Sequence, residues 1–118
     1  MIYNMLNDVG KELQSEFEAS EEMCGQVIDL FQLMSNKQRF RIVCILSRGD
    51  FCVNEIAEIL GADKVSNISQ QLKVLRLAGV IRCRREEKFM VYSLVDHRLR
   101  KVLMYLKEVY LARDPIGV

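Results

Sequence analysis

The stretch from Val53 to Leu94, VNEIAEILGADKVSNISQQLKVLRLAGVIRCRREEKFMVYSL, decides the fold of this 118-residue chain. Its first part has apolar residues at helical spacing and predicts helices over 53–60 and 64–78, separated by a turn at Gly61. After Gly79 the pattern alternates between apolar and polar residues over 80–85 and 89–95, which predicts two β-strands. Since the residues between these strands include no glycine, we expect a loop longer than a two-residue turn.

Helical periodicity extends on both sides of this stretch. Three helices are predicted before it, the second capped by Ser20, and one more is predicted after Asp96. We expect their apolar side chains to be buried, including those of Val27, Ile28 and Phe31. Ile59, in the helix over 53–60, is expected to point inward as well. The outer helices are predicted over 3–18, 21–34, 37–47 and 97–113.

The fold class predicted from these elements is mainly α with a small β-hairpin. A length of 118 residues suits one domain. Two short helices joined by a glycine-containing turn and followed by a hairpin are the order of a winged helix-turn-helix. Within this single domain we expect an extra N-terminal helix over 1–20, a core over 21–113 and a tail over 114–118.

Charge is distributed unevenly along the chain. Residues 1–35 contain one basic and seven acidic side chains, a net charge of −6, whereas residues 36–118 contain sixteen and nine, a net charge of +7. A basic segment favours a polyanionic partner, of which nucleic acid is the commonest. A solvated basic surface explains the charge alone equally well.

Several functional classes are disfavoured by the composition. No apolar run is long enough to span a bilayer, and the N-terminus lacks the pattern of a secretory signal. We therefore expect a cytoplasmic protein with no membrane partner. The chain has one histidine, no glycine-rich phosphate loop and no nucleophile motif, which argues against an enzyme.

The predicted helix over 64–78 carries short polar side chains in its N-terminal half. Such side chains reach base edges in the major groove, where Asn and Gln can pair with adenine. Basic residues further along the helix and in the hairpin suit phosphate or minor-groove contacts. The alternative is a solvated surface, but the ordered set favours DNA. The candidate DNA-binding residues are Ser66, Asn67, Ser69, Gln70, Gln71, Lys73, Arg76, Arg84, Arg85 and Lys88.

Four stretches within Leu33–Lys107 carry a resemblance to a known family: LMSNKQRFRIVCIL (33–46), FCVNEIAEILG (51–61), NISQQLKVLRLAGVIRCRR (67–85) and FMVYSL (89–94). They resemble the ArsR/SmtB family of bacterial repressors. The resemblance implies a winged helix that dimerises through its first and last helices and binds an inverted repeat in double-stranded DNA. It also implies release from the operator by a metal ion, a metalloid or a reactive sulfur species or oxidant. The chain departs from the family at Glu87, where a glycine is usual.

The resemblance also indicates where an effector would act. Cys52 matches the first cysteine of the family's arsenic-type site, but Asn54 replaces the second, so Cys24 would have to supplement a metalloid or metal site. The zinc-type site is absent, because Arg98 stands where an imidazole is needed. Cys44 matches the sulfur- or oxidant-sensing position, although the family's second cysteine is missing.

The role of the cysteines stays open. A lone Cys44 among apolar neighbours is more often a core residue than a sensor, and Cys83 is assigned no role. The effector-sensing candidates are Cys24, Cys44 and Cys52, and no cofactor is required. Two alternatives are a DNA-binding regulator with a non-thiol effector and a protein-interaction domain that uses the acidic N-terminal helix.

Overall fold

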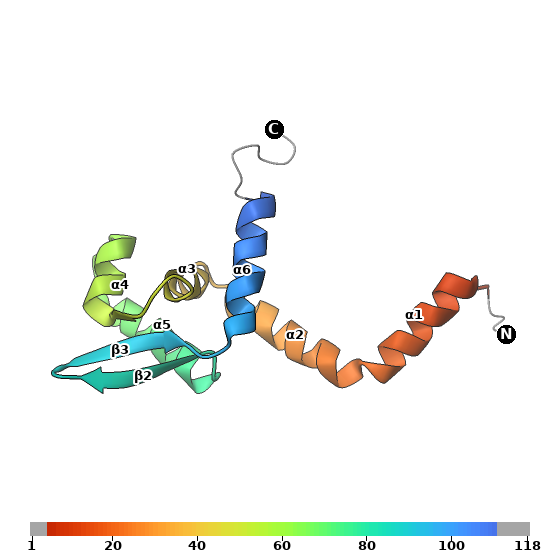
Figure 1. Ribbon diagram of the computed structural model, residues 1–118, viewed down its shortest axis with the longest axis horizontal. Coiled ribbons are helices and arrows are strands. Elements are labelled where there is room, and N and C mark those ends of the chain that lie inside the picture. The colour runs from red at the N-terminus through yellow and green to blue at the C-terminus, as the bar shows by residue number, and fades with distance from the viewer. Residues whose placement is uncertain (1–4, 111–118) are drawn as a thin grey trace. The chain divides into compact units, whose positions relative to one another are not determined.

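The computed structural model describes residues 5–110 and divides the chain into two units, Met1–Met34 and Ser35–Val118. Figure 1 shows the helices and strands of each unit. None of the described helices is long and apolar enough to cross a membrane. The first unit contains α1 (Asp8–Ala19) and α2 (Glu21–Met34). The second contains α3 (Lys37–Leu46), β1 (Phe51–Cys52), α4 (Val53–Leu60), α5 (Val65–Leu77), β2 (Ile81–Glu86), β3 (Phe89–Leu94) and α6 (His97–Tyr110).

The two helices of the first unit are separated at Ser20. The side chain of Asn7 caps α1 by accepting a hydrogen bond from the backbone N of Gly10 at 2.8 Å. At the other end, Ser20 Oγ donates to the carbonyl oxygen of Glu16 at 2.6 Å. Ser20 was predicted to cap the following helix, but its hydroxyl turns back to satisfy a carbonyl of α1 instead. The first residues of the predicted helix over 3–18 lie outside the described part of the chain.

Helices α1 and α2 expose their apolar faces. Neither helix buries any of its described residues, and Phe31 is 68% exposed. The prediction that Val27, Ile28 and Phe31 are buried is therefore wrong for a single chain. Helical spacing shows which side chains share a face, but it does not supply the surface that covers them. The exposed large apolar residues of α1 and α2 are Val9, Leu13, Phe17, Met23, Val27, Ile28 and Phe31.

The second unit has a continuous core under α5. Helices α3 and α5 pack against each other, and α4 packs against both. Full burial of an aliphatic side chain contributes about 1.5–3 kcal/mol, so this core holds α5 firmly in place. The fully buried residues of the three helices are Ile42, Val43, Leu46, Ile56, Ile68, Leu72 and Leu75.

The inward face of α4 differs from the prediction at one position. Ile56 and Ala57 are buried, and Val53 and Leu60 are half-buried on the same face. Ile59, predicted to point inward, is 53% exposed. At about 100° per residue it lies roughly 110° from the centre of the buried face, so it points sideways into solvent.

The helix-turn-helix connection is closed by Gly61. This residue has φ +62°, in the left-handed region that glycine adopts without strain. The backbone N of Ala62 donates to the carbonyl of Ala57 at 2.9 Å, which ends α4 in a Schellman-type arrangement. Helix α5 begins at Val65, one residue after the predicted start.

The sheet has the order β1-β3-β2 and is antiparallel throughout. Strand β1 was not predicted, because two residues are too short to show an alternating pattern. In the β2–β3 hairpin, here called the wing, Glu86 pairs with Phe89. Only Glu87 and Lys88 connect the strands, so the predicted longer loop is wrong. Glu87 reaches the tight turn by adopting φ +56° although it is not glycine.

Helix α6 follows the wing. Its first turn is capped by Asp96, whose carboxylate accepts from the backbone N of Arg98 at 2.9 Å. Leu99 and Leu103 are buried, and Arg100 Nε donates to the carbonyl oxygen of Ser47 at 2.7 Å. This bond ties α6 to the end of α3. The predicted last turn, at 111–113, and the predicted tail lie outside the described residues.

Candidate nucleic-acid interface

The polar surface of α5 is positioned by the buried side of the same helix. Ile68, Leu72 and Leu75 are fully buried, which fixes the rotation of α5 about its axis. Ser66 and Gln70 lie on the opposite side, one turn apart, and both are exposed. Their side chains are thus presented outward by a helix that the core prevents from turning. The exposed polar residues of α5, here called the recognition face, are Ser66, Asn67, Ser69, Gln70, Lys73 and Arg76.

Gln71, on the same helix, is not part of the recognition face. It is half-buried, and its Oε1 accepts a hydrogen bond from Arg39 Nη1 on α3 at 3.0 Å. The side chain predicted to face bases is therefore engaged by another helix. Arg39 is half-buried as well. No spacing in the sequence indicates this contact, because the two residues are 32 positions apart.

The most strongly paired cation of the wing is Arg84. Its Nη1 lies 3.0 Å from Asp50 Oδ2, and its Nη2 lies 2.8 Å from Glu86 Oε2. Hydrogen bonds to Asp50 and then to Glu86 raise the pKa of the guanidinium above its ordinary value. Asp50, which precedes β1, is not among the candidate site residues predicted from the sequence. A phosphate that binds Arg84 must therefore compete with two carboxylates.

The remaining basic residues of the wing lie near its turn. Arg85 is exposed, and its Nε donates to the carbonyl oxygen of Glu87 at 3.2 Å. Lys88 is exposed within the turn itself. Since Glu87 lies between them, the end of the wing combines two cations with a carboxylate. The structure thus places Arg84, Arg85 and Lys88 on one hairpin.

Cys44 and Cys24, two of the candidate sensing cysteines, are both partly shielded from solvent. Cys44 on α3 is half-buried, and burial raises the pKa of its thiol, with Lys107 acting in the opposite direction. A raised pKa leaves less thiolate and makes the sulfur less nucleophilic. In the first unit, Cys24 is half-buried, with its Sγ 3.8 Å from Ser20 Oγ. Cys83, which has no assigned role, is half-buried on β2.

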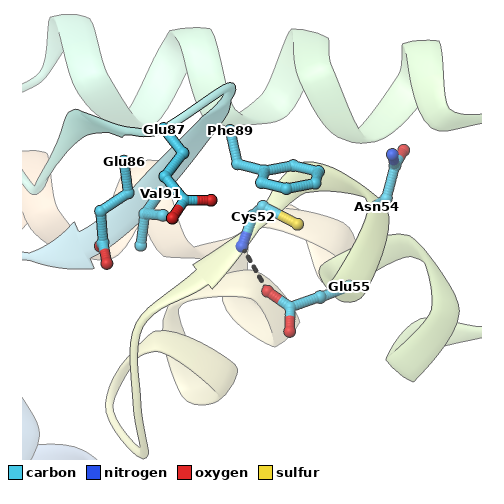
Figure 2. A pocket seen from close by; sticks show the side chains of 7 residues that line it. All are labelled: Cys52, Asn54, Glu55, Glu86, Glu87, Phe89 and Val91. Carbon is cyan, nitrogen blue, oxygen red and sulfur yellow. Dashed lines mark hydrogen bonds between the residues drawn. The ribbon is translucent and has the colours of Figure 1, made fainter.

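Cys52 lies at the start of α4, on the wall of a cavity of about 580 Å³ (Figure 2). Its backbone N donates to Glu55 Oε1 at 2.9 Å, a bond that caps α4 and lowers the pKa of Glu55. Phe89 lies beside Cys52, whereas Asn54 stands apart from it. The cavity is lined by Cys52, Asn54, Glu55, Glu86, Glu87, Phe89 and Val91.

This cavity does not fit the metalloid site that the resemblance implied. It offers one thiol, where a soft metalloid requires two or three thiolates. The nearby Glu55 carboxylate is already engaged with the backbone of Cys52. Among residues 5–110, no group of three or more metal-ligating side chains is present.

Comparison with known proteins places the chain among bacterial regulators. The family model described as bacterial regulatory protein, arsR family, matches residues 36–82, which span α3 to the start of β2. A biofilm growth-associated repressor from Agrobacterium fabrum is 31% identical over 96 residues, covering 81% of this chain and 81% of the relative.

Solved structures agree with this match. The transcriptional repressor BigR from Xylella fastidiosa superposes with a TM-score of 0.74 at 30% identity, covering 81% of this chain and 97% of that one. Reduced HlyU from Vibrio cholerae gives a TM-score of 0.73 at 25% identity, covering 80% and 99%. The predicted winged helix-turn-helix is confirmed by these neighbours.

Proposed function

Since the chain belongs to the arsR family of bacterial regulatory proteins, which are DNA-binding transcriptional regulators and not enzymes, we propose that it acts as a homodimeric repressor released by an effector. In this proposal each protomer inserts α5 into the major groove at one half of an inverted repeat. The wing then contacts the adjacent phosphates or the minor groove.

The observation that carries the proposal is the recognition face of α5. Six polar side chains lie exposed on a helix whose opposite side is fully buried. Base recognition requires donors and acceptors to be held within hydrogen-bond distance of a base edge, so a rigid presenting helix favours this use. Ser66, Asn67, Ser69 and Gln70 are assigned to bases, and Lys73 and Arg76 to phosphates.

A twofold partner is supported by the apolar side chains that a single chain leaves exposed. On α6, Val102 is 51% and Tyr105 is 65% exposed, and the apolar faces of α1 and α2 are exposed as described above. Soluble proteins rarely leave contiguous apolar surface uncovered, and such surface marks an interaction site. We assign these helices to the dimer interface, with α1 as an extra N-terminal helix of a single domain. Sedimentation equilibrium of the full chain should give the dimer mass.

The effector is proposed to be thiol-reactive, acting through Cys24, Cys44 or Cys52. One relative is described in its reduced form, which makes an oxidant the first effector class to examine. Burial raises the pKa of Cys44, which leaves less thiolate and lowers the nucleophilicity of this candidate. A metalloid bound by Cys24 together with Cys52 is a further candidate effector. A protein or other non-thiol ligand is the alternative effector.

DNA binding is tested by mobility shift with duplex from the chain's own upstream region at two salt concentrations. A protein that neutralises phosphates shows a logarithmic salt slope of roughly −0.9 per phosphate. We expect a steep slope and a preference for the upstream duplex over an unrelated one. A chain that retards neither duplex in dilute salt contradicts the proposal.

Release is tested on the same complex with hydrogen peroxide, a polysulfide and arsenite. The variants Cys24→Ser, Cys44→Ser and Cys52→Ser are compared with Cys83→Ser as the matched control. We expect one of the first three to abolish release while Cys83→Ser leaves it intact. If all four variants release DNA like the parent chain, sensing by cysteine is wrong and a non-thiol effector replaces it.

A further inference from the structure

A side-chain hydrogen bond joins α3 to α5 at Gln71. Arg39 Nη1 donates to Gln71 Oε1 at 3.0 Å, and both residues are half-buried. Arg39 is itself held at its backbone, because its N donates to Asn36 Oδ1, the cap of α3, at 3.0 Å. The guanidinium therefore reaches Gln71 from a part of α3 that is fixed by its own cap.

The chemistry of the two side chains sets the orientation of the Gln71 amide. A guanidinium has only donors, so the carbonyl oxygen of the amide must face Arg39 and the NH₂ group must face away. Bidentate pairing of glutamine with adenine uses both ends of the amide, the oxygen toward N6 and the nitrogen toward N7. With its oxygen turned to Arg39, Gln71 is poorly arranged for that pairing. Gln70, its neighbour, is exposed on the recognition face.

We propose that Arg39 and Gln71 are a positioning pair that holds the front half of α5 against α3, and that neither residue reads a base. This inference rests on the proposed function, because it concerns how the recognition face is presented to DNA. Base contacts tolerate only small displacements, whereas phosphate contacts by long flexible cations tolerate larger ones. Loss of the pair should therefore weaken operator binding much more than non-specific binding.

The test is a double-mutant cycle on the full-length chain. Arg39→Met and Gln71→Met preserve much of each side-chain volume and remove the hydrogen bond, singly and together. Arg41→Met is the matched control, because Arg41 is an exposed cation on the same helix. The probes are a duplex selected by the parent protein from a random-sequence library, its single-base-pair variants and an unrelated duplex. Thermal unfolding identifies any variant that does not fold, and Arg39→Gln then replaces Arg39→Met.

We expect each single variant to lower the ratio of operator to non-specific affinity about threefold to tenfold, and the double variant to lower it no further. In each single variant, the loss of affinity caused by a single-base-pair change should become smaller at several base pairs at once. The salt slope should stay at the parent value, and Arg41→Met should leave the ratio unchanged.

Three results overturn the positioning pair. The first is additive losses in the double variant. The second is a salt slope that is shallower by about 0.9 in Arg39→Met, which would identify Arg39 as a phosphate ligand. The third concerns the loss of affinity caused by single-base-pair changes. If Gln71→Met removes that loss at a single base pair and keeps it at all others, Gln71 is a base reader. Failure of the parent chain to select any duplex would instead remove the proposed function itself.

Discussion

Helix α5 and the wing present their polar groups in opposite ways. On α5 the recognition face is exposed and its scaffold is the fully buried row of Ile68, Leu72 and Leu75. On the wing, Arg84 is bound to Asp50 and Glu86, and the turn is made by a glutamate in a left-handed conformation. Near the wing turn, Phe89 is 48% exposed.

The difference suits the two regions to different contacts with DNA: fixed side chains to bases, and exchangeable cations to phosphates. The core holds α5, so its side chains can meet base edges without rearrangement. On the wing, the side chain of Arg84 is held only by exposed ion pairs, which stabilise a protein little, so its guanidinium can exchange carboxylates for a phosphate at little cost. We therefore expect sequence preference to depend on α5, and the wing to contribute to the salt-dependent part of affinity together with Lys73 and Arg76.

The largest expected effect concerns the scaffold of α5. Leu72→Ala should lower the free energy of unfolding by about 2–5 kcal/mol, because it leaves a cavity in a fully buried site. Phe89→Ala, on the half-exposed end of the wing, should lower it by less than about half as much. Urea denaturation measures both. Equal losses would show that the wing is as firmly packed as α5.

The second effect concerns base reading. Gln70→Ala should reduce discrimination against wrong bases by about 1–3 kcal/mol, since a bidentate contact to a base edge is lost. Arg85→Ala on the wing is the matched comparison and should weaken binding to all duplexes similarly, with a shallower salt slope. Titration of operator and single-base variants measures the difference. If Arg85→Ala alters base preference more than Gln70→Ala does, the roles of the two regions are reversed.

The third effect concerns the wing turn. Glu87→Gly should stabilise the chain by up to about 1 kcal/mol, because the left-handed conformation is unfavourable for any residue with a Cβ. It should also raise DNA affinity by removing a carboxylate beside the basic residues. Glu87→Gln separates the two causes, since it removes the charge but keeps the strain. Thermal unfolding in which Glu87→Gly is no more stable than Glu87→Gln contradicts the strain argument.

The smallest effect concerns the carboxylate that holds Arg84. Asp50→Asn should leave the free energy of unfolding close to that of the parent chain, because the ion pair is half-exposed. It should raise affinity for non-specific duplex about twofold to threefold and steepen the salt slope, since Arg84 becomes available to a phosphate. Glu108→Gln on α6 is the charge-matched control and should leave the slope unchanged. Identical slopes for the parent chain and Asp50→Asn would show that Arg84 does not contact DNA.

Much of the fold could be predicted from local patterns. The helices at α3, α4 and α5 and the two long strands were predicted within about two residues, because period and turn residues are properties of neighbouring positions. The errors arise where a local pattern is missing or where it does not determine burial. Strand β1 is too short to carry a pattern, and Phe31 obeys helical spacing on a face that one chain leaves uncovered.

For the candidate site too, local features could be predicted from the sequence and long-range contacts could not. The apolar repeat at Ile68, Leu72 and Leu75 determined, from sequence alone, that α5 is a helix with its polar residues facing outward. Only the tertiary structure decided which polar residues of the site are engaged by distant groups, because Arg39, which binds Gln71, and Asp50, one of the two partners of Arg84, lie 32 and 34 positions away. The spacing of apolar residues along α5 follows from the geometry of one helix. A hydrogen bond between helices depends on how they pack, and that is set by the whole core.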